Sequence, residues 1–145
     1  MSLGDVAPSF ALESDEGQVV HLHDFRGRSV VLFFYPGDFT SVCTKEAEHF
    51  RDSIDAFSAK GAVVLGVSKD PVESHRKFKK EHKLPFTLLS DLTGKVHRKY
   101  RVAGSLGGLL KGRKTFVIDK EGIIVHIFES ALNWKMHVSE ALAHC

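Results

Sequence analysis

The chain alternates between short apolar runs and longer amphipathic stretches. Residues 30–35 (VVLFFY) and 62–67 (AVVLGV) are rich in β-branched and aromatic side chains and follow glycines, which is typical of buried strands. Between them, one amphipathic helix is expected over residues 41–59, because apolar residues recur there at intervals of three and four: Ala47, Phe50, Ile54 and Phe57.

The second half of the chain predicts a further set of elements. Asp70 as an acidic cap and Pro71 in the first turn indicate a helix that runs to about His82. Asn133 is expected to cap a last helix. The other predicted elements are a short strand over 86–89, a short helix over 94–100 and an antiparallel hairpin formed by 115–119 and 123–128.

This order of elements favours a thioredoxin-like α/β fold. Parallel βαβ units come first, and an antiparallel pair with a covering helix comes last, so the expected architecture is a central mixed β-sheet flanked by helices. No repeat, low-complexity tract or linker divides the sequence. We therefore predict a single domain over residues 1–145.

Composition and charge exclude several classes of function. The chain is 43% hydrophobic and 26% charged with a net charge of +2, and its densest basic run, residues 75–83, is typical of a solvated helix face rather than a nucleic-acid interface. Its apolar runs are too short to span a membrane, and the N-terminal segment lacks the pattern of a signal peptide. Two cysteines do not make a disulfide framework, which predicts a reducing cytoplasm.

Cys43 is the strongest candidate for chemistry. The loop 36–41 follows a predicted strand, at the sheet edge where sites form in α/β proteins, and Thr40 is the expected N-cap of the next helix. Cys43 then lies in the first turn, where unpaired N–H groups and the helix dipole stabilise a thiolate. The alternative, an inert buried cysteine, explains less of this placement.

A stabilised thiolate is not sufficient for fast chemistry. An ordinary thiol is a few per cent ionised at neutral pH, so complete ionisation gains roughly tenfold, and part of that gain is lost to weaker nucleophilicity. The transition state must be stabilised separately, by donors that point at the reacting atoms. The Thr40 hydroxyl is one candidate, and a cation has to come from elsewhere in the chain.

The motif around Cys43 resembles a known family. Pro36, Thr40 and Cys43 match the P-x-x-x-T-x-x-C motif of the peroxiredoxins in register. The flanks FFYPGDFT and CTKEAEHFRD are similar to the bacterioferritin-comigratory or peroxiredoxin Q branch, as are APSFAL, LPFTLLSD and RKTFVIDKEG. The resemblance covers essentially the whole chain.

The resemblance implies a thiol peroxidase that reduces hydrogen peroxide and small organic hydroperoxides without metal, haem or another cofactor. Cys43 would be the peroxidatic cysteine, and Thr40 would hydrogen-bond the peroxide and the thiolate. Pro36 would shield the site, and Arg113 would be the missing cation. Glu46 matches an acid of this branch and would be a structural partner. An antioxidant role in cell redox homeostasis follows.

The resolving cysteine departs from the family pattern. The position five residues after Cys43 is Glu48, and residues 70–83 contain no cysteine. Cys145 is the only internal candidate for a resolving role. Otherwise the enzyme is a one-cysteine type that is reduced by thioredoxin, glutaredoxin or a low-molecular-weight thiol. The family resemblance implies a monomer or a homodimer.

Two other functions stay open at this point. A thiol-disulfide oxidoreductase is disfavoured because C-x-x-C is absent and because Thr115 stands where such proteins usually keep a proline. A non-enzymatic redox sensor or holdase on the same fold could keep the same residues, and only turnover with a reductant separates it from an enzyme.

The remaining motifs give weaker indications of function. His21 and His23 are expected to share a strand face at the surface, without a metal. The glycine-rich segment 104–112 lacks a phosphate-binding pattern and is expected to be a mobile loop beside the active site.

Overall fold

The computed structural model describes residues 1–102 and 112–145, and these form a mixed seven-stranded sheet in the order β2-β1-β5-β4-β3-β6-β7. β3, β4 and β5 are parallel, while β6 runs antiparallel to β3 and β1 antiparallel to β5. This confirms the predicted mixed sheet. The strands are β1 (Ala11–Ser14), β2 (Val19–His21), β3 (Ser29–Phe34), β4 (Ala62–Ser68), β5 (Thr87–Ser90), β6 (Lys114–Ile118) and β7 (Ile124–Glu129).

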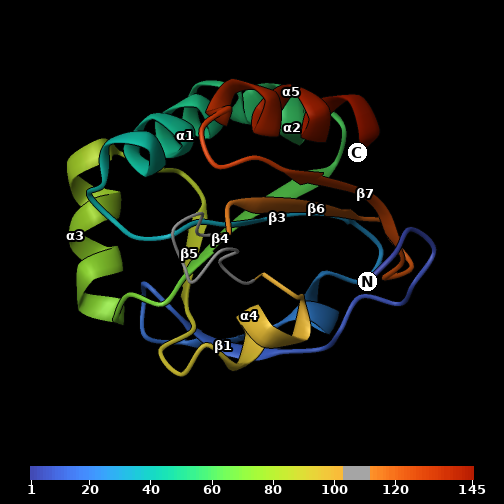
Figure 1. Cartoon of the computed structure of the whole chain (residues 1–145), viewed down its shortest axis with the longest axis horizontal. Coiled ribbons are helices and arrows are strands. Elements are labelled where there is room, and N and C mark those ends of the chain that lie inside the picture. Colours follow the sequence, from blue (N-terminus) through green and yellow to red (C-terminus); the bar gives the residue numbers. More distant parts are fainter. Residues whose placement is uncertain (103–111) are drawn as a thin grey trace.

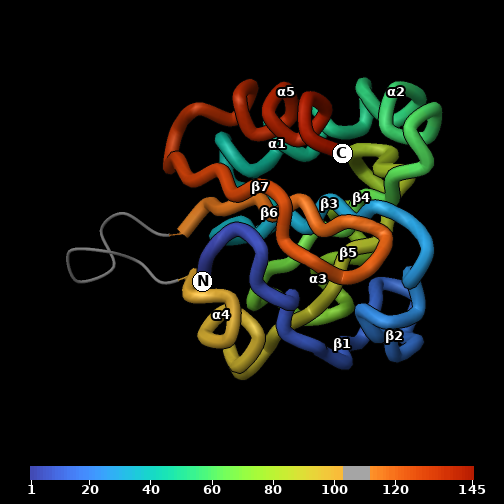
Figure 2. Tube along the Cα trace, turned by 90° about the vertical axis from the view of Figure 1, so that its right-hand side faces the viewer, coloured from blue at the N-terminus to red at the C-terminus, as the bar shows by residue number. Residues whose placement is uncertain are grey.

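Helices cover both faces of the sheet. In Figure 1, α1, α2 and α5 lie together above the central strands, and α4 lies below them with β1. Figure 2, turned by 90°, shows the same three layers. The helices are α1 (Ser41–Asp52), α2 (Ile54–Ala59), α3 (Val72–His82), α4 (Lys95–Lys99) and α5 (Trp134–His144), and a short 3₁₀ helix, η1, spans Leu22–Phe25.

Strand β3 is buried on both faces, as its continuous apolar sequence predicts. Val31, Phe33 and the following Tyr35 point into the core beneath α1, α2, α3 and α5, whereas Leu32 and Phe34 point into the core shared with α4 and the N-terminal segment. Since strand side chains alternate between faces, one apolar run supplies both cores. The carboxyl end of β3 is thereby fixed at the centre of the sheet, and the loop to α1 begins there.

Two details of the predicted helices were wrong. The expected helix over 41–59 is interrupted at Ser53, whose φ and ψ of −101° and 5° separate α1 from α2. Pro71, not Asp70, is the N-cap of α3, and the Asp70 carboxylate instead accepts hydrogen bonds from the Ser68 hydroxyl and the Asp38 amide. Asn133 does cap α5, because its Oδ1 accepts from the Met136 amide at 3.3 Å.

The sequence analysis did not define β1 and the edge strand β2, although it expected a strand around His21 and His23. The two strands have four and three residues, too few for a hydrophobic period to be visible. His21 ends β2, but His23 lies in η1, so the two histidines do not share a strand face as expected. No helix among the described residues combines the length and the apolar character needed to cross a membrane.

Candidate active site around Cys43

Cys43 lies in the first turn of α1, as predicted. Thr40 is the N-cap, with extended φ and ψ of −78° and 152°, and its carbonyl accepts the first helical hydrogen bond from the Thr44 amide at 2.9 Å. The Cys43 side chain is 1% exposed and packs in the core between α1 and the sheet. A thiolate at this position faces the positive end of the helix dipole in a largely desolvated environment.

Arg113 supplies the cation that the sequence analysis required. It directly precedes β6, is 4% exposed, and its Nη2 donates to Cys43 Sγ at 3.1 Å. The same guanidinium donates from Nη1 to Glu46 Oε1 at 2.8 Å and from Nε to the Ala131 carbonyl at 2.9 Å. Three separate acceptors therefore fix the planar group against the sulfur, which a single ammonium could not do.

The charges of this cluster shift one another's pKa values. Burial alone would lower the pKa of Arg113, but the negative charges of Glu46 and Cys43 outweigh it and raise that pKa above its ordinary value. For Glu46, burial dominates over the attraction of Arg113 and raises the pKa of the carboxyl from 4.5 to about 7. Arg113 thus stays charged, while Glu46 titrates near neutral pH.

His137 closes the far side of the cluster and was not found from the sequence. Its Nε2 lies 2.8 Å from the Ser130 carbonyl and its Nδ1 lies 2.8 Å from the Thr115 hydroxyl. Burial lowers its pKa to about 4, so the ring is neutral, donates from Nε2 and accepts from Thr115. Glu46 Oε2, 3.7 Å from His137 Nδ1, has no hydrogen-bond partner among the described residues.

Thr40 and Pro36 lie beside Cys43 in the chain, but both are exposed. The Thr40 hydroxyl donates to the Gly37 carbonyl at 2.9 Å, so its single proton is directed into the loop and not toward Cys43. The geometry brings Cys43, Arg113 and Glu46 together and leaves the Thr40 hydroxyl bonded to its own loop.

The comparisons with known proteins decide the family. The sequence matches the model described as the AhpC/TSA family over residues 3–127. The chain belongs to the AhpC/TSA family. It is 46% identical to the chloroplastic peroxiredoxin Q of Oryza sativa subsp. japonica over 142 residues, which are 98% of this chain and 65% of that protein. The chain therefore spans just under two thirds of the length of this curated relative.

Solved structures agree with this placement in the AhpC/TSA family. The peroxidoxin BcpB of Mycobacterium tuberculosis superposes with a TM-score of 0.90 at 37% identity, covering 99% of this chain and 95% of that one. The bacterioferritin comigratory protein of Xanthomonas campestris gives 0.85 at 29% identity, covering 92% and 88%. The predicted thioredoxin-like fold and the resemblance to the peroxiredoxin Q branch are confirmed.

The predicted cytoplasmic location was wrong. Several curated relatives with 44–46% identity are named chloroplastic proteins, which contradicts it. The prediction rested on cysteine usage, and a low cysteine count indicates only a reducing environment. Cysteine usage does not distinguish one reducing compartment from another.

A buried polar network in this AhpC/TSA-family chain holds the loop that leads to Cys43. The Asp38 side chain, 1% exposed, accepts hydrogen bonds from the hydroxyls of Tyr35 at 2.7 Å and Ser74 at 2.8 Å. It also lies 2.7 Å from His75 Nδ1, while the other nitrogen of that ring lies 2.9 Å from the Leu89 carbonyl. Burial, followed by the Asp38 charge, raises the pKa of Tyr35 well above its ordinary value. The loop is thus tied to α3 and β5 from within.

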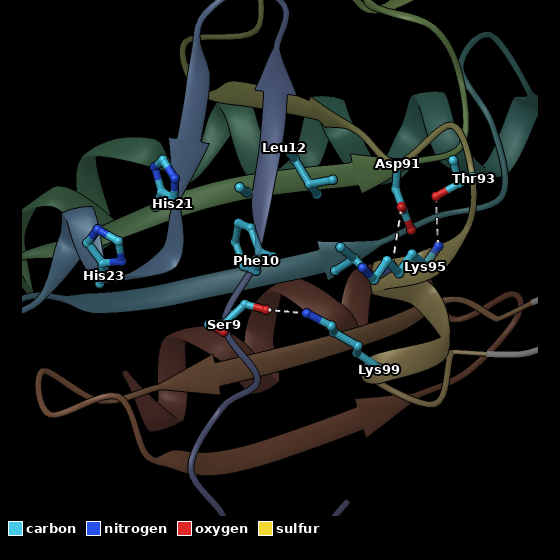
Figure 3. A pocket seen from close by; sticks show the side chains of 11 residues that line it. Ser9, Phe10, Leu12, His21, His23, Asp91, Thr93, Lys95 and Lys99 are labelled. Carbon is cyan, nitrogen blue, oxygen red and sulfur yellow. Dashed lines mark hydrogen bonds between the residues drawn. The ribbon is translucent and has the colours of Figure 1, made fainter.

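A cavity of about 460 Å³ lies away from this cluster, between β1 and α4. Figure 3 shows Phe10 and Leu12 on its floor, with Lys95 and Lys99 on α4 and two histidines on the opposite side. Neither Cys43 nor Arg113 lines it. Concavity alone would select this cavity as the site, but it contains no nucleophile paired with a fixed cation, so we assign the chemistry to Cys43.

Two sequence predictions concern Glu48 and the glycine-rich segment 104–112. Glu48, at the position of the usual resolving cysteine, lies 3.2 Å from His82 Nδ1 and 3.7 Å from Arg51 Nη1, on the side of α1 that faces α3. The glycine-rich segment 104–112 falls, except for Gly112, outside the described residues.

The charge state of Glu46 predicts a pH dependence of stability. The pKa of Glu46 is higher in the folded state, so its contribution to the free energy of unfolding falls as pH rises from about 4.5 to about 7. The lowered pKa of His137 acts in the opposite direction between about 4 and 6.5. As pH rises, we expect the free energy of unfolding of Glu46→Gln to increase relative to that of the wild type. The increase should reach up to about 3 kcal/mol at pH 8.

Chemical denaturation across this pH range measures the difference. Glu73→Gln is the matched control, because Glu73 is exposed on α3 and, in the part of the chain that the structure describes, forms an ion pair with Lys77 alone, at 3.7 Å. Its curve should run parallel to that of the wild type. A Glu46→Gln curve parallel to the wild type would contradict the raised pKa of Glu46 in the folded state.

Proposed function

We propose that this chain is a thiol peroxidase in which Cys43 is the peroxidatic cysteine. The observation that carries the proposal is the 3.1 Å contact between Arg113 Nη2 and Cys43 Sγ, made by a guanidinium that two other acceptors hold in place. The Xanthomonas relative supports it, since that protein is described by its alkyl peroxide reduction activity. Hydrogen peroxide and small organic hydroperoxides are the proposed substrates.

The first step transfers one oxygen atom to sulfur. The Cys43 thiolate attacks the terminal oxygen of the hydroperoxide, the S–O bond forms as the O–O bond breaks, and the departing oxygen takes a proton to leave as water or alcohol. Negative charge moves from the sulfur to the departing oxygen. Arg113 would stabilise the negative charge first on the sulfur and then on the departing oxygen, because its guanidinium lies against the sulfur and stays charged.

The other predicted residues take supporting roles. Glu46 would position Arg113 through their 2.8 Å contact and would not touch the peroxide. Thr40 would exchange its bond to the Gly37 carbonyl for one to the bound peroxide, because a hydroxyl can rotate without a change in the backbone. Pro36 would fix the start of the loop by its restricted φ.

The sulfenic acid would be reduced by an external thiol. His137 contacts Glu46, and Cys145 follows eight residues later, a rise of about 12 Å from His137 along the axis of α5. A disulfide needs Cα atoms within roughly 7 Å, so pairing of Cys145 with Cys43 in one chain would require the end of α5 or the first turn of α1 to move. Burial also raises the pKa of the Cys145 thiol, which disfavours its thiolate.

A one-cysteine cycle accounts for these features. One external thiol condenses with the sulfenic acid, releasing water and forming a mixed disulfide, and a second thiol restores Cys43. Thioredoxin, glutaredoxin or a low-molecular-weight thiol can supply both thiols.

Three further expectations stay predictions. Residues 1–145 form a single domain, the chain is a monomer or a homodimer, and it binds neither nucleic acids nor membranes.

Intact mass after one equivalent of hydrogen peroxide tests this cycle. We expect the wild type and Cys145→Ser to gain one oxygen at Cys43 equally, and to consume peroxide at rates within about twofold of each other when dithiothreitol is supplied. Loss of two hydrogens in the wild type, or a linked dimer, that disappears in Cys145→Ser would make Cys145 the resolving residue. Oxidation of Cys43 without repeated turnover would favour the redox sensor, and no rapid oxidation of Cys43 would contradict the peroxidase.

A further inference from the structure

We propose that His126, Glu140 and His144 form a binding site for a divalent transition-metal ion of the zinc class. His126 lies on β7, and the other two residues lie one turn apart near the end of α5, which packs against β7 (Figure 1). One ligand atom from each of the three lies within 4.8 Å of the others. The site is separate from Cys43 and independent of the proposed peroxidase function.

The distances are close to those of a bound ion. Glu140 Oε2 lies 3.7 Å from His126 Nε2 and 3.9 Å from His144 Nδ1. Ligands around tetrahedral zinc stand about 3.3 Å apart, because each metal–ligand bond is close to 2 Å. The two imidazole rings are stacked, with centroids 3.6 Å apart and an angle of 3° between their planes. The lone pair of an imidazole nitrogen lies in the plane of its ring, so one of the two rings has to turn out of the stack for both to bind one ion.

An unpartnered nitrogen points independently to a ligand. His126 Nε2 is buried and has no hydrogen-bond partner among the described residues, although a buried polar atom is normally paired. An imidazole nitrogen without a hydrogen-bond partner can offer the lone pair that a metal ion requires.

His144 Nδ1 has a competing partner, the main-chain oxygen of Glu140, which lies 2.9 Å away. That contact requires a proton on Nδ1, whereas a metal ion requires its lone pair. Binding through Nδ1 would therefore replace this hydrogen bond with the metal–nitrogen bond.

The ligand types select the metal. Two imidazoles and one carboxylate suit Zn²⁺, whereas Ca²⁺ and Mg²⁺ require oxygen ligands. Three protein ligands leave a fourth position for water. The ion would fasten the last turn of α5, next to Cys145, to β7. The sequence alone does not predict this site, because its ligands come from two elements that meet only in the folded chain.

Two other groups of potential ligands are less suitable. Around Asp38, the carboxylate oxygens are already bonded to three donors of the protein. His21, His23 and Asp24 form an exposed group, in which the His23 side chain is 68% accessible. The exposed group provides a matched control, since it has the same ligand types without burial.

Isothermal titration with Zn²⁺ tests the proposal on the full chain without a histidine tag. Cys43→Ser/Cys145→Ser is the parent, so that thiolates do not compete for the ion. We expect one bound ion per chain, at least about tenfold weaker binding in both His126→Gln and His144→Gln, and unchanged binding in His23→Gln. Zn²⁺ should also raise the unfolding temperature of the parent and should do so less in these two variants.

His144→Gln keeps the test valid if His126→Gln folds poorly, because His144 is on the last helical turn and 40% exposed. Equal affinity in the parent, His126→Gln and His144→Gln would overturn the proposal. So would a loss of binding that follows His23→Gln instead. Co²⁺ bound to the parent should give the absorption of a tetrahedral or five-coordinate site, and a six-coordinate spectrum identical to that of aqueous Co²⁺ would also overturn it.

Discussion

Replacing Arg113 by methionine is expected to lower kcat/KM for hydrogen peroxide by about 100- to 1000-fold, the usual effect of removing one fixed donor from a developing charge. Methionine keeps much of the volume but cannot donate to Cys43 Sγ at 3.1 Å. Arg113→Lys should recover only part of the rate, because one ammonium cannot contact Cys43, Glu46 and Ala131 together. Stopped-flow measurement of Cys43 oxidation gives the rate directly.

The controls separate chemistry from folding. Arg28 is an exposed arginine next to β3, at the end of the strand opposite the loop that leads to Cys43, and Arg28→Met should keep the wild-type rate. Arg113→Met also leaves Glu46 buried without its partner, so Arg113→Met/Glu46→Leu should regain stability. The double variant should stay slow. A fast double variant would show that Arg113 acts on the fold and not on the reaction.

Asp38→Leu is expected to lower the free energy of unfolding by about 3 kcal/mol or more. The substitution leaves the Tyr35 and Ser74 hydroxyls and the His75 ring buried without their shared acceptor. Breaking a buried pair by removing one partner typically costs this much. The loop before α1 would also lose its anchor to α3, so peroxide reduction should slow as well. Urea denaturation with two independent probes measures the loss.

Two further variants show whether the lost stability comes from the buried network around Asp38. Asp38→Leu/His75→Leu should be more stable than Asp38→Leu alone, because the second substitution removes the stranded imidazole. Asp55→Ala is the surface control, since Asp55 is exposed at the start of α2, and it should change stability by less than about 1 kcal/mol. If Asp38→Leu were as stable as this control, the network would have no structural role.

The parts of the fold that could be predicted are those fixed by neighbours in the sequence. The run of residues 30–35 gave β3 within one residue, because its apolar side chains can be buried only in the middle of a sheet. Thr40 and Cys43 were placed correctly at the start of α1, since a helix boundary depends on a few adjacent residues. The short strands β1 and β2 were missed. They pair with each other locally, but β1 joins the rest of the sheet through β5, which is distant in the chain.

The residues of the site also divide into those that the sequence identified and those that only the fold brings together. Sequence alone determined that Cys43 is a first-turn thiol, and the family resemblance selected Arg113, which lies 70 residues away. Only the tertiary structure decided that His137 faces Glu46, that Asp38 anchors the loop and that His126 meets α5. The physical reason is burial: desolvation raises the pKa of Glu46 to about 7 and lowers that of His137 to about 4. Burial is a property of the packed molecule, and no local pattern encodes it.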